Sequence, residues 1–217
     1  MKVDILVPTD LSEITLEQYQ RFEKINTEEN QDTNFLMHKM VEIFCNLNLR
    51  DVAKIRYNYV KSILNDLNGL FATKEELIPT FTLQGVEYGF IPVLDDMSLG
   101  EYIDLDENFS SWQTMHKAMA VLYRPVKLKQ KDKYQIEEYK GLDAADVMKK
   151  MPLDVVMSSM VFFYHLNKEL LQTTLNYLSK ELPNKMTMEQ RQTLAENGVG
   201  IKASMASLKG MLQNMTI

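Results

Sequence analysis

The stretch FTLQGVEYGFIP, residues 81–92, decides the fold class of this 217-residue chain. Apolar and polar residues alternate on both sides of Gln84-Gly85, which predicts two short strands joined by a tight turn. A second hairpin is expected to pair residues 125–128 with residues 134–138 across a charged turn. Apart from a short edge strand expected over residues 3–7, the remaining sequence has helical patterns. The sequence therefore predicts an α+β fold, mostly α, with a small β-hairpin element in the middle, near 80–92 and 125–138.

Helix-start signals and apolar stripes predict helices before the first hairpin. Thr15 and Gln18 match a capping box, in which each side chain accepts a bond from the other residue's backbone N–H, and a helix follows them. A second and a third helix are expected to form a helical hairpin, the third running from about Asp51 to a glycine C-cap at Asn68-Gly69. The apolar faces of these two helices are Leu36, Met40, Ile43, Phe44 and Leu47, then Val52, Ile55, Tyr59, Ile63 and Leu67.

The rest of the chain is also mostly helical in pattern. A helix is expected over residues 112–123, and a shorter one over 143–151. Pro152 suits the first turn of a long helix that runs to about Leu182. Thr187 and Gln190 repeat the capping-box pattern, and a C-terminal helix carries the apolar stripe Ile201, Met205, Leu208 and Leu212. We therefore expect one helix-rich domain over residues 1–182 and a C-terminal helical appendage over residues 183–217.

Composition indicates a folded, soluble protein. Hydrophobic residues make up 45% of the chain and charged residues 25%, as in globular proteins. The most apolar run, residues 155–166, is shorter than the roughly 20 residues that span a bilayer, so it is expected to be a buried helix. The single cysteine, Cys45, lies in an apolar pattern and is interpreted as a small buried hydrophobe. Because the segment before Pro8 is too short for a signal peptide, we expect synthesis in the cytoplasm.

The net charge of −6 is unevenly distributed along the chain. Residues 1–108 hold 20 acidic and 9 basic residues, whereas residues 109–217 hold 10 acidic and 15 basic residues. An acidic total disfavours nonspecific binding to nucleic acid, which depends on lysine and arginine. The asymmetry favours head-to-tail packing of copies, because one end attracts the other. Charges scattered over solvated faces are the simpler interpretation.

Motifs for catalysis and cofactor binding are absent from the sequence. There is no phosphate-binding loop, no dinucleotide fingerprint and no nucleophile elbow. The histidines His38, His116 and His165 each stand alone in an amphipathic helix, with no histidine or cysteine at metal-ligand spacing. We therefore expect no catalytic residue, no cofactor and no metal, and conclude from the sequence that the chain is not an enzyme.

Acidic residues gather after the first hairpin. Asp104, Asp106 and Asn108 match the first positions of a calcium-binding loop. The match then fails, because Phe109 stands where the loop needs glycine and Met115 where it needs glutamate. Two interpretations explain the acids better: a rim that accepts a basic partner, or acids placed before the helix that starts near residue 112. The run comprises Asp95, Asp96, Glu101, Asp104, Asp106 and Glu107.

Lysines mark the second hairpin. Lys127, Lys129, Lys131 and Lys133 occupy alternate positions, which share one face of a strand. Nucleic-acid binding is one interpretation of this pattern. A charged edge that blocks sheet-to-sheet aggregation is the simpler one, because no aromatic residues for base stacking are interleaved with the lysines.

The chain has 15 methionines, and several lie on apolar helical faces. Filling of the core accounts for most of them, since methionine adapts to irregular space. The same adaptability suits a surface that accepts more than one partner geometry. The C-terminal stripe with Met205, Leu208 and Leu212 is expected to dock on a neighbouring protein as readily as on its own domain.

Four stretches carry a resemblance to a known group of proteins. They are VPTDLSEITLEQYQ (residues 7–20), YGFIP (88–92), LGEYIDLD (99–106) and MHKAMAVLYRP (115–125). Together they resemble small proteins encoded among the virion-assembly genes of tailed bacteriophages, including phages of the crAss-like kind. The resemblance spans most of residues 1–165 and carries over no functional residues.

The resemblance implies a non-enzymatic virion structural or assembly protein, made in the host cytoplasm and located in the virion. A tail or head–tail (portal-proximal) component is expected, with other virion proteins and copies of itself as partners, in a homo-oligomer. No membrane is expected, and nucleic acid is not an expected partner. The alternatives are a tail assembly chaperone or packaged virion protein, then a DNA-associated protein that uses the lysines, and last a hydrolase.

The interface is predicted to lie on residues 99–106 and 115–125. Aromatic and arginine residues dominate the binding energy of protein interfaces, so Trp112, Tyr123 and Arg124 are expected to anchor it. Burial in the core explains Trp112 and Tyr123 equally well. The predicted interface residues are Glu101, Asp104, Asp106, Trp112, Tyr123, Arg124, Met205, Leu208 and Leu212.

Overall fold

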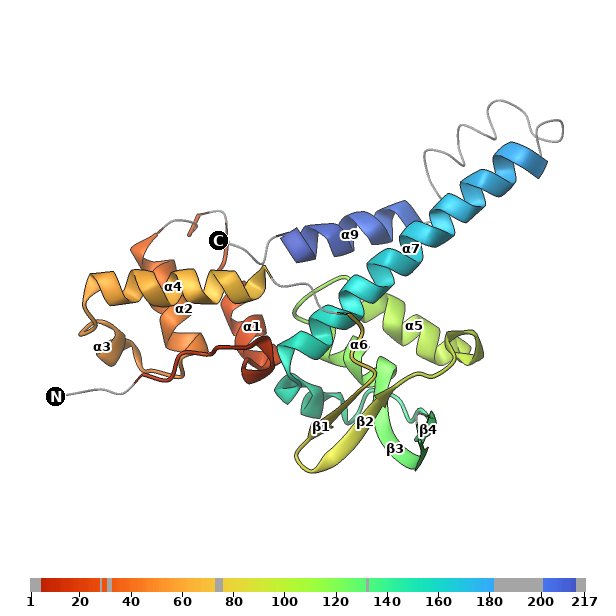
Figure 1. Cartoon of the computed structure of the whole chain (residues 1–217), viewed down its shortest axis with the longest axis horizontal. Helices are drawn as coiled ribbons and strands as arrows, with labels where there is room; N and C mark the ends of the chain where they lie inside the picture. Colours follow the sequence, from red (N-terminus) through yellow and green to blue (C-terminus); the bar gives the residue numbers. More distant parts are fainter. Residues whose placement is uncertain are drawn as a thin grey trace.

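A computed structural model describes residues 5–27, 29–30, 33–72, 76–131, 133–181 and 201–213. The fold is α+β and mostly α, as the sequence predicts. Helices α1–α4 form one end of the molecule, a small sheet lies at its lower edge, and α7 starts beside α1 and runs above the sheet toward the upper right (Figure 1). The helices are α1 (Leu16–Glu23), α2 (Asn34–Phe44), α3 (Leu49–Val52), α4 (Tyr57–Phe71), α5 (Leu99–Asn108), α6 (Met115–Leu122), α7 (Leu153–Glu181) and α9 (Ile201–Gln213).

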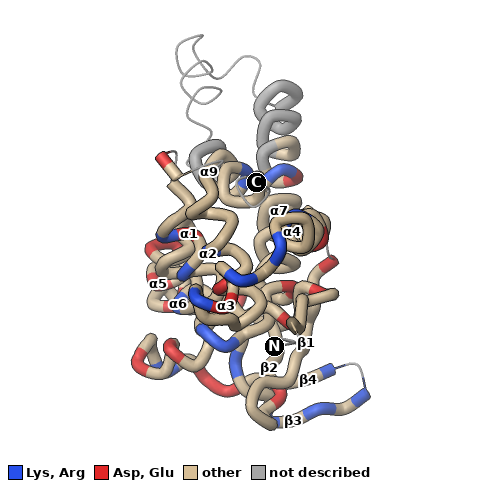
Figure 2. Tube along the Cα trace, turned by 90° about the vertical axis from the view of Figure 1, so that its left-hand side faces the viewer, with Lys and Arg blue, Asp and Glu red and all other residues tan. Residues whose placement is uncertain are grey.

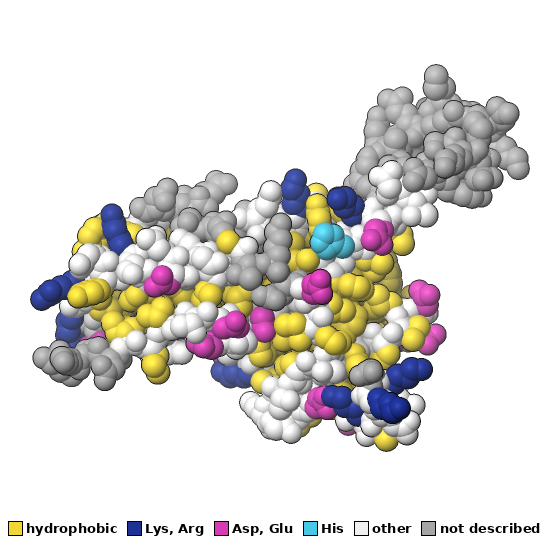
Figure 3. Space-filling view, in the orientation of Figure 1, with side chains coloured by type: hydrophobic (Ala, Val, Ile, Leu, Met, Phe, Trp, Pro, Cys, Tyr) yellow, Lys and Arg dark blue, Asp and Glu magenta, His cyan; other side chains and the backbone are white. Residues whose placement is uncertain are grey.

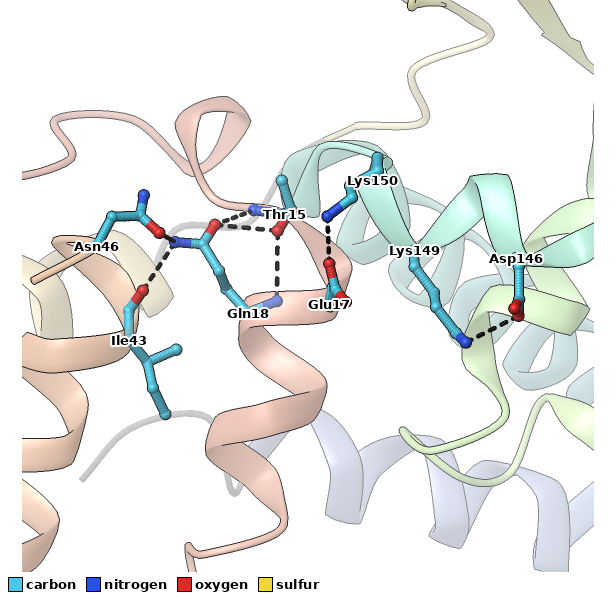
Figure 4. Close-up of polar contacts among 8 residues, drawn as sticks. All are labelled: Thr15, Glu17, Gln18, Ile43, Asn46, Asp146, Lys149 and Lys150. Carbon is cyan, nitrogen blue, oxygen red and sulfur yellow. Dashed lines mark hydrogen bonds and ion pairs between the residues drawn. The ribbon is translucent and has the colours of Figure 1, made fainter. Parts of the chain in front are cut away.

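The capping box predicted at the start of α1 is confirmed, and it also connects α1 to its neighbour. The backbone N–H of Gln18 donates to the Thr15 hydroxyl, and the Gln18 side chain accepts from the Thr15 N–H at 2.9 Å. The amide of the same glutamine donates to the carbonyl of Ile43 in α2 at 2.9 Å (Figure 4). Glu17 pairs with Lys150, which ties α1 to the segment before α7.

Both predicted hairpins are confirmed. Strands β1 (Thr80–Leu83) and β2 (Val86–Phe90) form the first, with Gln84 and Gly85 at φ of 52° and 82°, as a type I′ turn requires. Strands β3 (Tyr123–Gln130) and β4 (Lys133–Ile136) form the second. Because β2 also pairs with β3, the hairpins join into one antiparallel sheet of order β1-β2-β3-β4.

One continuous hydrophobic core connects the helical end to the sheet. Near α1 it is aromatic: Tyr19 lies 4.4 Å from Trp112 and 5.8 Å from Phe71 between ring centroids. At the other end of the chain, α9 lies beside α7 (Figure 1), and its Leu208 is buried in the same core. The expected domain boundary at residue 182 stays a prediction, because residues 182–200 lie outside the described part of the chain.

The structure corrects several local predictions. Residues 5–8 form no strand, and residues 3 and 4 lie outside the described residues. The third helix is broken at residues 53–56 into α3 and α4, and α4 continues past Gly69 to Phe71. A glycine inside a helix costs about 1 kcal/mol, which burial of the Phe71 side chain offsets. Tyr59 faces outward and is 57% exposed.

The later helices need smaller corrections. Residues Ala145–Lys150 form a 3-10 helix in place of the α-helix expected over 143–151. The long helix after Pro152 is confirmed as α7. The predicted capping box at Thr187 and Gln190 lies outside the described residues. Within the described part of the chain, no helix combines the length and the hydropathy that a membrane span needs.

Candidate protein-binding surface on helix α5

Helix α5 contains the acidic residues that the sequence singled out, and it begins with a capping box. The Ser98 hydroxyl accepts from the backbone N–H of Glu101 at 3.3 Å, and Glu101 Oε2 accepts from the Ser98 N–H at 2.7 Å. At the other end, the Asn108 side-chain amide donates to the carbonyl of Asp104 at 2.7 Å. The start and the end of α5 are therefore fixed by local hydrogen bonds.

A buried ion pair links the inner face of α5 to strand β3. Arg124 of β3 donates from Nη2 to Glu101 Oε1 at 2.9 Å, and their side chains are only 14% and 8% exposed. The Tyr139 hydroxyl donates to Asp104 Oδ2, and the Arg124 guanidinium lies 6.0 Å from the centre of the Tyr139 ring. Burial, followed by this bond to a carboxylate, raises the pKa of Tyr139 well above its usual value. The hydroxyl is therefore protonated at neutral pH, as a donor must be.

These contacts correct two of the acidic predictions. Glu101 does not belong to an exposed rim, because inside the fold its carboxylate accepts from the Ser98 backbone N–H and pairs with Arg124. Asp104 is half-buried, and its carboxylate accepts a hydrogen bond from the Tyr139 hydroxyl. Asp106 is exposed, as an interface residue must be. Arg124 is an internal partner of α5 and is largely buried, so it is not an exposed anchor.

The two predicted aromatic anchors belong to the core. Trp112 is 4% exposed, and its ring packs on Tyr19. Tyr123 is fully buried, and its hydroxyl bonds the carbonyl of Ile78 at 2.8 Å and the Ser159 hydroxyl at 2.9 Å. The prediction that Trp112 and Tyr123 anchor a partner is therefore wrong for this fold, because neither ring reaches the surface.

The outer face of α5 is apolar and exposed. Leu99 is 74% exposed, Tyr102 59% and Ile103 45%. Residues three and four apart lie side by side on a helix, so these three form one stripe, which Asp106 continues at the next turn. We call Leu99, Tyr102, Ile103 and Asp106 the α5 outer face. Sequence reasoning marked residues 99–106 as an interface but selected the acids and missed this stripe. The spacing of Leu99, Tyr102 and Ile103 indicates a helical stripe, but it does not indicate that the stripe faces solvent.

The predicted C-terminal interface stripe packs mostly against the rest of its own chain. Leu208 is 2% exposed, and Met205 and Leu212 are half-buried where α9 lies beside α7. Leu208 is therefore a core residue and is not available to a partner. Met205 and Leu212 remain partly accessible at the edges of this contact.

The hairpin of β3 and β4 is strongly basic. Its lysine side chains gather at one end of the molecule, drawn dark blue at the lower right of Figure 3. They do not share one strand face as expected, because Lys131 lies in the turn with a φ of 53° and Lys133 begins β4. Lys129 pairs with Glu87 of β2. We call this feature the lysine hairpin; its lysines are Lys127, Lys129, Lys131 and Lys133, all exposed.

Among the described residues, no three His, Cys, Asp or Glu side chains are arranged to hold a metal ion. His116 is buried and lies 3.1 Å from the side-chain nitrogen of Gln20, and burial lowers its pKa. Burial also raises the pKa of the Cys45 thiol to about 11, so this thiol is protonated at neutral pH. Both groups have the environment of packed core residues.

The chain matches no protein-family profile, no curated protein and no solved structure.

Proposed function

We propose that this chain is a non-enzymatic virion structural or assembly protein of a tailed bacteriophage, and that it binds a neighbouring virion protein through the α5 outer face. The observation that carries the proposal is the exposed stripe of Leu99, Tyr102 and Ile103. The resemblance of residues 7–20, 88–92, 99–106 and 115–125 to phage assembly proteins gives the biological setting. A place in the tail or at the head–tail junction suits a protein that acts by binding other virion proteins.

The stripe has the chemistry of a binding surface. Contiguous apolar side chains on the surface of a folded protein are typical of interaction sites, and tyrosine is enriched at interfaces. Asp106 continues the stripe, and Glu107 follows it, so a polar rim adjoins an apolar centre. The stripe would also lose solvent-exposed apolar area on binding, which favours association.

The support beneath the stripe favours the same function. Glu101 and Arg124 fix the inner side of α5, and the capping box fixes its start. A helix that is already held in one orientation loses little conformational freedom when a partner binds, so more of the contact energy appears as affinity. We expect the α5 outer face to dock as a rigid element.

The test compares two tyrosines that differ in location and little else. Tyr102 on α5 is 59% exposed and Tyr59 on α4 is 57% exposed. A glutamate at either position adds one negative charge and removes one exposed aromatic ring. Each variant is supplied to a phage that lacks the gene, and purified particles are analysed by mass spectrometry and infectivity. We expect Tyr59→Glu to enter particles like the wild type, and Tyr102→Glu to be depleted at least roughly tenfold, a loss of about 1.4 kcal/mol.

Two results separate the alternatives. If Tyr102→Glu enters particles at the level of the wild type, the α5 outer face is not the binding surface. If the wild-type protein is required for infectivity but absent from mature particles, the chain is an assembly chaperone and not a virion component.

A further inference from the structure

We infer that copies of this chain bind one another head to tail, with the α5 outer face of one copy against the lysine hairpin of the next. This inference rests on the proposed function and names the partner of the α5 outer face as a second copy. It commits to a contact between two different surfaces of the same chain.

The two surfaces carry opposite charges that are not neutralised within the described part of the chain. On α5 and in the segment just before it, four exposed carboxylates form no ion pair with a described residue: Asp106 and Glu107, then Asp95 and Asp96. On the hairpin side, Lys127, Lys131 and Lys133 likewise have no ion-pair partner among the described residues, whereas Lys129 is paired with Glu87. Such complementary patches speed the encounter of two surfaces and select the matching orientation.

Both surfaces also carry exposed apolar side chains. Leu128 lies among the hairpin lysines and is 50% exposed, and Val86 at the start of β2 is 43% exposed. Figure 3 shows further hydrophobic side chains gathered between the lysine hairpin and α7. The lysine hairpin therefore presents an exposed apolar side chain among its lysines. It matches an apolar stripe bordered by carboxylates on α5, so contact would bury apolar surface while it pairs the charges at the rim.

The arrangement of the two surfaces favours a contact between copies over a contact within one chain. Figure 2 shows α5 on the left side of the molecule and the basic β3–β4 hairpin at the lower right. Within the described part of one chain, Asp106 and Glu107 form no ion pair with the hairpin lysines. A contact between unlike surfaces leaves one of each free on every dimer, so assembly continues to a ring or a filament.

Symmetric pairing is disfavoured by the same charges. Two α5 outer faces in contact would bring their carboxylates together, and two lysine hairpins would bring their ammonium groups together. Like charges placed opposite one another at an interface cost several kcal/mol. The unlike pairing avoids this cost.

The experiment uses three charge-reversal variants of the full chain. The hairpin variant carries Lys127→Glu, Lys131→Glu and Lys133→Glu. The α5 variant carries Asp106→Lys and Glu107→Lys. The control variant carries Lys24→Glu, Arg50→Glu and Arg56→Glu, which change the net charge as the hairpin variant does at exposed positions of the helical end. Circular dichroism checks that each variant is folded, and sedimentation velocity over a range of concentrations and salt measures association.

We expect the wild type and the control variant to associate in a concentration-dependent way that high salt weakens. The hairpin variant alone and the α5 variant alone should each bind themselves at least roughly tenfold more weakly. An equimolar mixture of these two variants should associate again, because the α5 outer face of each variant then carries the opposite charge to the hairpin of the other. A chain that carries both sets of reversals should associate again, since its charges are exchanged and still complementary.

Several outcomes would overturn the inference: a wild type that is monomeric throughout, variants that associate like the wild type, or a mixture that forms no complex. A further outcome is salt-sensitive binding of duplex DNA by the wild type that the hairpin variant loses, without self-association. That result would show that the hairpin lysines bind nucleic acid and not a second copy of the chain. Failure here is distinguishable from failure of the proposed function, because Tyr102→Glu can still block entry into particles when no self-association occurs.

Discussion

The ion pair between Glu101 and Arg124 gives the most direct test of how α5 is held. The Glu101 carboxylate accepts from Arg124 at 2.9 Å and from the Ser98 N–H at 2.7 Å. Glu101→Gln keeps the size of the side chain and an oxygen for Ser98, so it removes mainly the charge. It leaves the Arg124 guanidinium, which is 14% exposed, without its counter-charge.

The expected loss of stability follows from this burial. Breaking a buried ion pair by removing one partner costs about 3–5 kcal/mol, because the remaining charge is left poorly solvated. Partial exposure of Arg124 places the expected loss at the lower end, about 3 kcal/mol for Glu101→Gln and a similar value for Arg124→Met. With both charges removed, no unpaired charge stays buried, so the double variant should lose no more than either single variant, well below the sum of the two single losses.

The assay is urea unfolding followed by far-UV circular dichroism, arranged as a double-mutant cycle. The matched control is the exposed pair of Glu17 and Lys150, whose side chains are 41% and 55% exposed. Glu17→Gln should cost less than about 1 kcal/mol, as exposed pairs do. Additive losses in the Glu101 and Arg124 cycle, or a loss as small as that of Glu17→Gln, would refute the reasoning that the buried pair fixes α5.

Three further predictions concern the core. Gly89→Ala should destabilise the chain by about 1–3 kcal/mol in urea unfolding, because a Cβ there would lie 2.4 Å from the Tyr134 ring. On α5, a Cβ at Gly100 meets nothing within 4 Å, so Gly100→Ala should stabilise the chain slightly. Leu208→Ala should cost about 2–5 kcal/mol; a loss near zero would show that α9 does not belong to the core. Burial lowers the pKa of His116, so the unfolded chain binds the proton more readily and stability falls as the pH drops below about 6.5. Unfolding measured against pH should show His116→Gln losing part of this acid sensitivity, and an unchanged pH profile would contradict the assignment.

Local signals predicted the elements that local chemistry specifies. The Gln84-Gly85 turn, the Thr15 and Gln18 capping box and the start of the long helix after Pro152 each depend on residues a few positions apart. The same kind of signal failed at Gly69, where a glycine that could end a helix lies inside one. Its helix continues because Phe71 is buried in the core, which is a contact that the local pattern does not contain.

The candidate surface could be predicted only in part. The stretch over residues 99–106 was marked as acidic and as part of an interface, and its stripe of Leu99, Tyr102 and Ile103 is visible in the sequence. An apolar stripe ordinarily faces the core, so the spacing alone points these residues inward. They face outward because the opposite face of α5 packs inward, with Glu101 paired to Arg124 of β3 and Leu105 against the core.

The sequence by itself determined the two hairpins, the start of α1 and the long helix after Pro152, because backbone hydrogen bonding, capping and turn geometry act over a few residues. It did not predict α5. Only the tertiary structure decided which aromatic rings are buried, as for Trp112 and Tyr123, and which face of α5 meets solvent. It also decided that two separate hairpins share one sheet through the pairing of β2 with β3. These outcomes depend on long-range packing, in which burial is a property of the neighbours that a side chain meets and not of the side chain alone.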